Sequence, residues 1–492
     1  MLRRWFRAIV VQSTIALVAF LLLVVGAQAL AQDQASSAAP SATSGPMAPS
    51  ATPVASASPM AAPPAVTPTG IPYDASADWA GRVRSGVGLL VMIAIAYALS
   101  RDRRHVRWRL VAMGVVLQLV LGLFTLTAPG RYIFTKFNDV VAGLLGFTAA
   151  GSTFLFGELA KPMGQNLGAY FTFGVLPTII FFSSLMAVLY HLGVMQVVVR
   201  GVAKVMQKTM GTSGAETLSA AGNIFVGQTE APLLIRPFIE DMTTSELMAV
   251  MTGGFATVAG GVLAAYVGML QTAFPDIAGH LLSASIMSAP AALVIAKVMV
   301  PEPEPEKSRT YGKLDVDLQS DDANVIGAAA RGAGEGLQLA LNVAAMLLAF
   351  IALIAMVNAG VGWAGRLAGV EGLTLERILG WVLAPIAWIM GVPWQDSQLI
   401  GSLLGVKTVL NEFLAYQQLA ARAGELSHLR SMLIASYALC GFANFGSIAI
   451  QIGGIAGIAP SRRGDLARLG LRAMIGGTLA AFMTACVVGM VY

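Results

Sequence analysis

Long apolar stretches follow one another along most of this chain, with short polar loops between them. About 20 consecutive apolar residues are enough for an α-helix to cross a bilayer. The pattern therefore predicts an all-α polytopic membrane protein with about eight transmembrane helices, and an amphipathic stretch near residues 131–145. The expected spans lie near residues 87–100, 110–127, 167–192, 246–272, 278–300, 337–361, 432–458 and 469–491.

Two further segments, residues 213–238 and 397–422, are too rich in polar residues to be ordinary spans. The first contains Glu230 and the second contains Glu412. Non-helical backbone is tolerated at membrane depth where it lines a cavity enclosed by protein. Each segment is therefore predicted to be a re-entrant hairpin that enters and leaves the membrane on one side.

The two hairpins belong to an internal repeat. A Gly-Phe-Ala-Thr phrase begins at Gly254 and a Gly-Phe-Ala-Asn phrase at Gly441, and each is followed by a final apolar span. An inverted repeat with an ionisable group in each copy is typical of a transporter that closes around a polar solute at the midplane. The expected regions are N-terminal scaffold helices 81–166, transport repeat 1 at 167–300, a solvated cytoplasmic linker 301–335 and transport repeat 2 at 336–492.

The composition agrees with a membrane protein. Hydrophobic residues make up 56% of the chain and charged residues only 12%, which excludes an ordinary water-soluble protein. The 53 glycines favour close helix packing and broken helices. The two cysteines, Cys440 and Cys486, lie in apolar spans, so they support neither a disulfide framework nor a metal site.

The N-terminal segment has the pattern of a secretory signal. Three arginines precede an apolar run at residues 8–27, and small residues follow it at the spacing of a cleavage site. Residues 1–31 are thus predicted to be a signal peptide, with an uncleaved N-terminal anchor as the alternative. Residues 32–80, rich in Ala, Pro, Ser and Thr, are predicted to be a disordered periplasmic leader.

The net charge of +5 follows the loops. The basic clusters at residues 101–109 and 461–472 are expected on the cytoplasmic side by the positive-inside rule. Arg200, Lys204 and Lys208, one helical turn apart, are expected to lie on the anionic inner membrane surface. This orientation predicts a multi-pass protein of a bacterial inner membrane whose mature N- and C-termini are both periplasmic.

The first hairpin offers groups for recognising a planar ring. Gln228 carries an amide, Thr229 a hydroxyl and Glu230 a carboxylate. This combination of donors and acceptors fits the polar edge of a heterocycle.

The second repeat offers groups for hydroxyls. Glu412 can accept two charge-assisted hydrogen bonds, as a sugar diol would donate. Asn444 and Ser447 are three residues apart and are expected to face the same way. The two repeats together predict a pocket for a ligand with a heterocycle and a ribose.

Four phrases carry a closer resemblance: GNIFVGQTEAPLLIRPF, MTGGFATVAG, GVKTVLNEFLAY and CGFANFGSIAIQIGG. From about residue 83 to the C-terminus, the chain closely resembles the concentrative nucleoside transporters. The resemblance implies a homotrimeric elevator transporter for nucleosides, which is not an enzyme and needs no cofactor besides a coupling ion. It assigns the nucleobase to Gln228, Thr229, Glu230 and Val262, and the ribose to Glu412, Asn444 and Ser447, with Phe442 packed beside the ligand.

The same resemblance addresses the coupling ion. Asn223, Val226, Thr257 and Val258 match the sodium site of the sodium-coupled branch, and side-chain and backbone oxygens of this kind suit a small hard cation. The proton-coupled branch has a different pattern around the first acid. Sodium is therefore favoured, and proton coupling is the alternative.

Other interpretations of these residues remain open. Glu230 paired with Arg236, and Glu412 paired with Lys407, would be structural acids, since buried charges usually have partners. An intramembrane protease built on Ser183 or Ser184 with His191 is a further alternative, but it gives the paired acids no role. A hairpin transporter for another solute, such as a carboxylate, would call for basic groups at the site.

Overall fold

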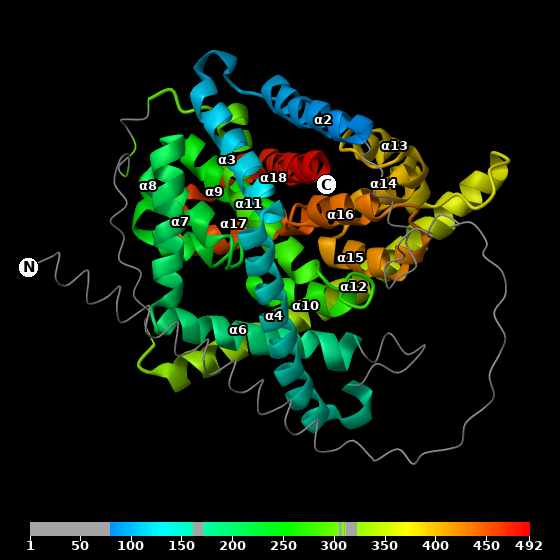
Figure 1. The fold of residues 1–492 in the computed structure, drawn as a ribbon, viewed down its shortest axis with the longest axis horizontal. Coiled ribbons are helices and arrows are strands. Elements are labelled where there is room, and N and C mark those ends of the chain that lie inside the picture. Colours follow the sequence, from blue (N-terminus) through cyan, green and yellow to red (C-terminus); the bar gives the residue numbers. More distant parts are fainter. Residues whose placement is uncertain (1–78, 161–170, 305–307, 309, 311–321) are drawn as a thin grey trace, which may run out of the picture.

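The computed structural model describes residues 79–160, 171–304, 308, 310 and 322–492, and every element in these parts is a helix (Figure 1). The predicted signal peptide 1–31 and nearly all of the leader 32–80 lie outside the described residues. The expectation of an all-α protein is confirmed. Eight of the described helical segments are long and apolar enough to cross a membrane.

The eight candidate spans differ in two places from the predicted ones. The stretch expected to be amphipathic near residues 131–145 belongs to helix α4 (Ala128–Phe156), which is long and apolar enough to span. The span expected at residues 432–458 is instead two short helices, α16 (Leu429–Leu439) and α17 (Phe445–Ile458). Six further candidate spans correspond to α2 (Trp79–Ala98), α3 (Trp108–Leu126), α6 (Leu176–His191), α11 (Ile277–Met299), α12 (Val325–Leu367) and α18 (Arg463–Val491).

Backbone geometry explains the break between α16 and α17. Gly441 has φ +117°, a conformation that residues with a side chain rarely adopt. Asn444 then starts α17 as its N-cap, because its side chain accepts a hydrogen bond of 2.8 Å from the Ser447 amide. The first repeat has the same plan, with α9 (Thr244–Ala256) and α10 (Gly260–Leu270) separated by a short break.

Both predicted hairpins are pairs of short helices joined by a turn. The first consists of α8 (Gly214–Gly222) and the 3₁₀ segment η4 (Ala231–Asp241), and the second of α14 (Trp394–Val409) and α15 (Glu412–Ala421). Local capping explains where α8 and α15 start. The Glu216 carboxylate accepts from the Ser213 backbone amide at 2.7 Å at the start of α8, and the Asn411 side chain accepts from the Leu414 amide at the start of α15. Helix α13 (Leu375–Ile389) bends back by 119° into α14.

The two repeats meet at their helix breaks. A methyl group added at Gly441 would lie 2.6 Å from the carbonyl oxygen of Phe255, so the two Gly-Phe-Ala phrases are in direct contact. Helices α11 and α18, which end the two repeats, also pack against each other. The helix breaks and the final helices of the two repeats therefore lie against each other.

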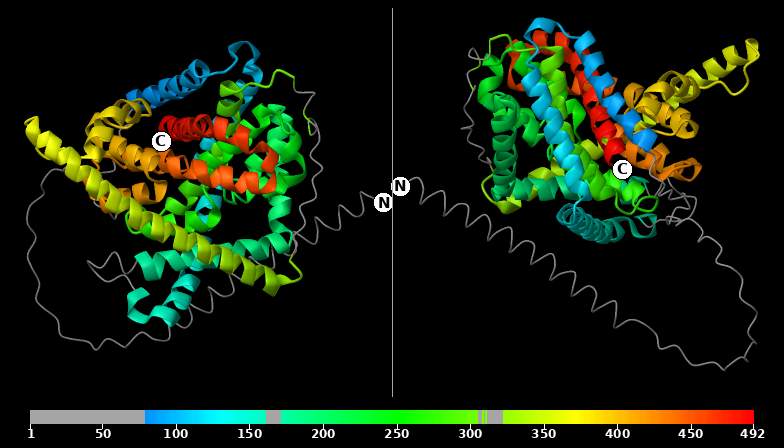
Figure 2. Two further views of the ribbon diagram at one scale, coloured as in Figure 1. Left: turned by 180° about the vertical axis from the view of Figure 1, so that it is seen from behind. Right: turned by 45° about the horizontal axis from the view of Figure 1, so that its top comes forward.

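Helices α6 and α12 form a tightly crossed pair. Gly332 and Gly336 let α12 approach α6 so closely that added methyl groups would lie 2.7 Å and 3.0 Å from the carbonyl oxygens of Ser183 and Ile179. The Ser184 hydroxyl donates to the Ala329 carbonyl oxygen at 2.9 Å. Figure 2 shows α12 crossing the back of the molecule and extending beyond it.

One face of the amphipathic helix α7 (Val194–Met210) is basic, as expected from its spacing. Arg200, Lys204 and Lys208 are all exposed along it. The helix joins α6 to the first hairpin and packs against α8.

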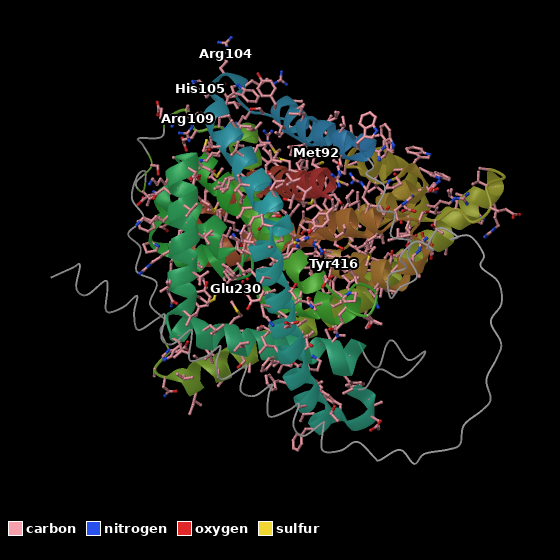
Figure 3. All side chains as sticks on the ribbon, in the orientation of Figure 1. Met92, Arg104, His105, Arg109, Glu230 and Tyr416 are labelled. Atoms are coloured by element: carbon pink, nitrogen blue, oxygen red, sulfur yellow. The ribbon has the colours of Figure 1, made fainter. Side chains whose placement is uncertain are left out.

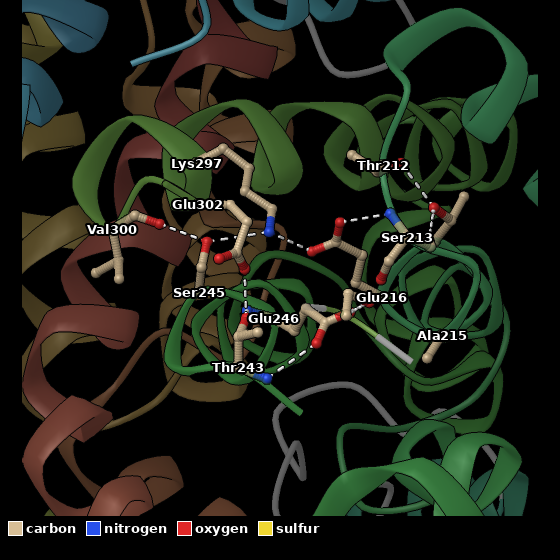
Figure 4. Close-up of polar contacts among 12 residues, drawn as sticks. Thr212, Ser213, Ala215, Glu216, Thr243, Ser245, Glu246, Lys297, Val300 and Glu302 are labelled. Carbon is tan, nitrogen blue, oxygen red and sulfur yellow. Dashed lines mark hydrogen bonds and ion pairs between the residues drawn. The ribbon is translucent and has the colours of Figure 1, made fainter. Parts of the chain in front are cut away.

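A buried polar cluster joins the ends of α8, α9 and α11 (Figure 4). Lys297 lies 2.6 Å from the carboxylate of Glu216 and donates a 3.0 Å hydrogen bond to Ser245. Glu246 closes a capping box with Thr243, whose hydroxyl donates to Glu302. In the sequence Glu216 is only an interruption of an apolar stretch, and its partner Lys297 follows 81 positions later.

The same cluster corrects one expectation about the linker 301–335. The sequence predicts a solvated linker, but Glu302, Ser308 and Thr310 are buried. Ser308 donates a 2.5 Å hydrogen bond to Glu246, and Thr310 accepts from the amides of Gly214 and Ala215. These described linker residues satisfy polar groups at helix ends, which is why they are not exposed to solvent.

Candidate functional site

The Glu412 carboxylate is fixed in the candidate site by two side-chain hydrogen bonds. It lies at the first position of α15 and is only 4% exposed. The Tyr266 hydroxyl donates to its Oε1 at 2.8 Å, and the Asn444 amide donates to its Oε2 at 3.1 Å. Since Tyr266 belongs to α10 and Asn444 to the break before α17, this carboxylate joins the second hairpin to both broken helices.

Lys407 does not pair with Glu412, so that structural alternative is wrong. Its ammonium donates to the carbonyl oxygens of Ala438 and Cys440, at 2.9 Å and 3.3 Å. A cation at these carbonyls is favourable because they end α16. Lys407 thus stabilises the end of α16, and the hydrogen-bond donors to Glu412 are the neutral side chains of Tyr266 and Asn444.

Glu230 lies at the end of the first hairpin's turn, immediately before η4. It is exposed, and among the described residues no ion pair joins it to Arg236. In Figure 3, Glu230 and Tyr416 lie within the outline of the bundle, whereas Arg104, His105 and Arg109 lie at its edge. The alternative in which Glu230 pairs with Arg236 is therefore not formed in the described structure.

The tip of the first hairpin contacts the second repeat. Gln228 is buried, and its amide nitrogen donates to the Ser447 hydroxyl at 3.3 Å. Thr229 packs against α17, where a methyl group on Gly454 would lie 2.9 Å from its side chain. The predicted base-reading and ribose-reading residues thus approach each other across the repeat interface.

The two apolar site residues occupy suitable positions. Val262 is buried on α10, one helical turn before Tyr266, so the two side chains share a face. Phe442 is partly buried in the break before α17, and its carbonyl oxygen accepts from the Asn444 amide at 2.9 Å. Val262 is thus one helical turn from Tyr266, and Phe442 is two residues from Asn444; Tyr266 and Asn444 are the residues that donate hydrogen bonds to Glu412.

The proposed cation residues lie at the first hairpin's turn and the break after α9. Asn223 ends α8, and Thr257 ends α9. The hairpin turn is tied to α10 by a 2.9 Å hydrogen bond from the Gly260 amide to the Phe225 carbonyl oxygen. Val226 and Val258 lie in these two non-helical segments, where backbone carbonyl groups are no longer committed to helical bonding.

Asn223 fits the requirement for a cation ligand. It is 1% exposed, and both its amide oxygen and its amide nitrogen lack a hydrogen-bond partner. Leaving a buried acceptor unpaired is costly, so such a group in a folded protein calls for a partner not supplied by the chain. An oxygen-seeking cation would satisfy the Asn223 oxygen, and the Thr257 hydroxyl lies at the adjoining helix end.

Comparison with known proteins agrees with this arrangement. Three family models match the chain in order: "Na+ dependent nucleoside transporter N-terminus" at residues 87–159, "Nucleoside recognition" at 172–273, and "Na+ dependent nucleoside transporter C-terminus" at 280–489. A Bacillus subtilis relative, "Uncharacterized transporter YutK", is 47% identical over 407 residues, covering 82% of this chain and 98% of its own. The chain belongs to the concentrative, sodium-dependent nucleoside transporter family.

Animal relatives are similar in sequence but longer. "Sodium/nucleoside cotransporter 1" of Rattus norvegicus is 45% identical over 424 residues, which cover 83% of this chain and 63% of the rat protein. The chain therefore spans about 63% of the length of such relatives.

Solved structures of the family share the fold. The structure of CNTnw in an inward-facing substrate-bound state matches with a TM-score of 0.75 and 44% identity, over 83% of this chain and 97% of that one. A CNTnw variant in an outward-facing state matches with a TM-score of 0.77 and the same identity and coverage.

Two residues that contact the predicted site of this nucleoside transporter family member were not predicted from the sequence. Tyr266 lies in an apolar span, where the sequence pattern does not distinguish it from its neighbours. Its buried hydroxyl nevertheless requires a hydrogen-bond partner, which is Glu412. Gln451 lies within the CGFANFGSIAIQIGG phrase, and its amide donates to Gln228 Oε1 and to the Met251 carbonyl oxygen, both at 3.1 Å. A lone glutamine in an apolar helix was the available signal for the second residue.

Because the chain belongs to a transporter family, the alternative of an intramembrane protease is wrong. The contacts of Ser183, Ser184 and His191 agree with this. The Ser184 hydroxyl donates a hydrogen bond to the Ala329 carbonyl oxygen of α12, and Ser183 packs near Gly261 and Gly332. The buried Nδ1 of His191 has no hydrogen-bond partner. The described contacts thus provide no activated serine here.

A cavity of about 260 Å³ lies elsewhere in this family member, between the α3–α4 junction, the start of α11, and α16. Its lining includes Arg131, Asp276, His280 and Tyr437. None of the candidate site residues lines it.

Proposed function

We propose that this protein is a sodium-coupled symporter that imports nucleosides across a bacterial inner membrane. The observation that carries the proposal is the carboxylate of Glu412, buried without a cationic partner and held by neutral donors from both repeats. Such an acid is costly to bury, which makes it a functional group by default in a membrane protein. Family membership and the animal relatives named as sodium/nucleoside cotransporters support the substrate and ion.

Different residues bind the two parts of the nucleoside, the base and the sugar. We assign the nucleobase to Gln228, Thr229, Glu230 and Val262, and the ribose to Glu412, Asn444 and Ser447, with Phe442 beside the ligand. Tyr266 and Asn444 orient the Glu412 carboxylate, so that its remaining lone pairs can accept hydrogen bonds from two ribose hydroxyls. A neutral, hydroxyl-rich solute matches this set better than an anion, because two acids would repel an anion.

Sodium would bind at Asn223, Val226, Thr257 and Val258. The ion would satisfy the unpartnered oxygen of Asn223 and fix the turn that precedes Gln228, Thr229 and Glu230. Ordering a binding turn in this way raises the affinity for a second ligand, which is the thermodynamic basis of symport.

Movement of the site would follow the elevator scheme. The tightly crossed α6 and α12 are suited to a fixed scaffold, since their glycines bring the two backbones into contact. The hairpins and broken helices, which meet at the Gly-Phe-Ala phrases, are suited to move as one unit. A homotrimer with periplasmic termini and the basic loops on the cytoplasmic side completes the proposal.

The test is uptake of radiolabelled uridine and adenosine into proteoliposomes under an inward sodium gradient or an inward proton gradient, imposed separately. Accumulation driven by sodium alone is expected. Accumulation driven only by protons would keep the nucleoside assignment and overturn the sodium site. No accumulation under either gradient, in protein that remains monodisperse, would overturn the proposed activity.

Replacing Asn223 by Ala should weaken the response to sodium more than the recognition of nucleoside. Because one oxygen ligand is lost, the sodium concentration for half-maximal uptake should rise on the order of tenfold. Nucleoside affinity at saturating sodium should change much less. The measurement is uridine uptake across a sodium titration, with the exposed Asn342→Ala as control; an unchanged sodium response would place the ion elsewhere.

A further inference from the structure

Gln451 is a buried amide that touches the candidate site without being part of the ligand assignments. It lies on α17, is 1% exposed, and donates from Nε2 to Gln228 and to the backbone of α9. We propose that Gln451 is a positioning residue that locks the carboxamide of Gln228 in one orientation and thereby selects which edge of a nucleobase is bound. The inference rests on the proposed nucleoside transport and adds a specificity rule to it.

The Met251 carbonyl determines the orientation of Gln451. A backbone carbonyl oxygen can only accept, so the amide nitrogen of Gln451 must face it, at 3.1 Å. The same nitrogen has a second hydrogen, which it donates to Gln228 Oε1 at 3.1 Å. In the reversed orientation, the Gln451 oxygen would face two other oxygens.

Gln228 is then fixed in turn. Its oxygen is occupied by Gln451, and its own nitrogen donates to the Ser447 hydroxyl at 3.3 Å. An amide nitrogen carries two hydrogens, and Ser447 uses one of them. Gln228 therefore keeps one hydrogen of its nitrogen for the ligand, while its oxygen already accepts from Gln451 with one of its two lone pairs.

The contact between the two glutamines is built into the packing. A methyl group at Gly254 would lie 2.7 Å from the Gln451 nitrogen and 2.9 Å from Gln228 Cβ, so α9 needs a glycine at this point. The Gln451 oxygen remains buried without a partner, which is a cost that a merely space-filling side chain would not carry. Both observations indicate that the donor face of Gln451 is what the position requires.

A hydrogen-bond donor at Gln228 favours nucleobases that have an acceptor on the edge that contacts Gln228. Uracil and hypoxanthine carry a carbonyl oxygen where cytosine and adenine carry an amino group. At that position the amino group would place a donor against a donor, whereas the carbonyl oxygen accepts. The protein should therefore bind keto nucleosides more tightly than the matching amino nucleosides.

The test compares two nucleoside pairs that differ at this edge, uridine with cytidine and inosine with adenosine. Their dissociation constants are measured for the purified full-length protein in saturating sodium. Wild type should prefer the keto member of each pair. In Gln451→Leu the Gln228 amide can rotate, so the keto preference should fall by roughly tenfold, towards equal binding.

A double-mutant cycle separates positioning from general support of the fold. In a Gln228→Leu background, Gln451→Leu should no longer change the keto preference, because the group on which it acts is gone. The matched control is Gln395→Leu at the exposed start of α14, which should keep the wild-type preference. If Gln451→Leu does not fold, the preference is measured in Gln451→Glu, whose side chain cannot donate two hydrogens at once.

The remaining outcomes each contradict the inference. An unchanged keto preference in Gln451→Leu, or an equal loss of affinity for all four nucleosides, would assign Gln451 a purely structural role. A wild-type preference for amino nucleosides would mean that Gln228 does not present a donor. If wild type binds none of the four nucleosides, the proposed function fails and this inference fails with it.

Discussion

Glu412→Gln should abolish nucleoside uptake while leaving the protein folded and inserted in the membrane. The carboxylate accepts from Tyr266 and Asn444 and is proposed to accept two further hydrogen bonds from the ribose. Hydrogen bonds to a charged group contribute about 1.5–3 kcal/mol each. The amide removes one of these bonds and the charge that strengthens the other, which should lower kcat/KM by a factor on the order of 10² to 10³.

The geometry gives a second reason for a large effect. An amide at position 412 turns one acceptor oxygen into a donor nitrogen, which would face either Tyr266 or the Asn444 amide. The Asn444 side chain is itself fixed, because its oxygen caps α17 by accepting from Ser447. It cannot turn round to accommodate the change without uncapping the helix.

Uptake in proteoliposomes and the melting temperature of the purified protein check this prediction together. The exposed Glu371→Gln serves as the matched control. Tyr266→Phe should give a smaller loss, because it removes one of the two supports and leaves the charge in place. Unaltered uptake by Glu412→Gln, with normal melting, would remove Glu412 from the site.

The sequence was most informative where a polar residue interrupts an apolar stretch. Because Glu230 and Glu412 are expensive to place in a membrane, each of them marks the hairpin that carries it. The repeated Gly-Phe-Ala phrases indicate where the helices break. In the folded protein these two phrases touch, with Gly441 directly against the Phe255 carbonyl.

The partners of the polar residues could not be predicted. Tyr266 is 146 positions from Glu412, and Gln451 is 223 positions from Gln228. No periodicity in a sequence relates residues so far apart, because their contact depends on how the two repeats pack. The Lys407 alternative failed for the same reason: the nearest acid in sequence is not its partner, and the helix end that binds it is formed by α16.

Hydropathy alone does not show where a span is continuous. Residues 432–458 are apolar enough to suggest one span, but Gly441 and the Asn444 cap divide them. The beginning of the linker has the acidic, proline-rich composition of a solvated segment. Its buried residues instead satisfy the ends of α8 and α9, a demand that arises only once the helices are in place.

Lys297→Met should strongly destabilise the fold. Glu216 and Lys297 are 2.6 Å apart, and their side chains are only 2% and 5% exposed. Removing one partner of a buried pair leaves the other charge without compensation, which typically costs about 3–5 kcal/mol. The neighbouring acids Glu246 and Glu302 cannot compensate, because they carry the same sign of charge as Glu216.

The pair can be tested by restoring neutrality. The melting temperature of purified Lys297→Met should fall by roughly 5–10 °C, whereas Lys204→Met on the exposed face of α7 should melt near wild type. Adding Glu216→Gln to Lys297→Met should recover most of the loss, since a neutral amide costs far less to bury than an unpaired carboxylate. That recovery would show that the cost comes from the isolated charge rather than from the altered packing, and a Lys297→Met protein as stable as wild type would show that the pair contributes nothing.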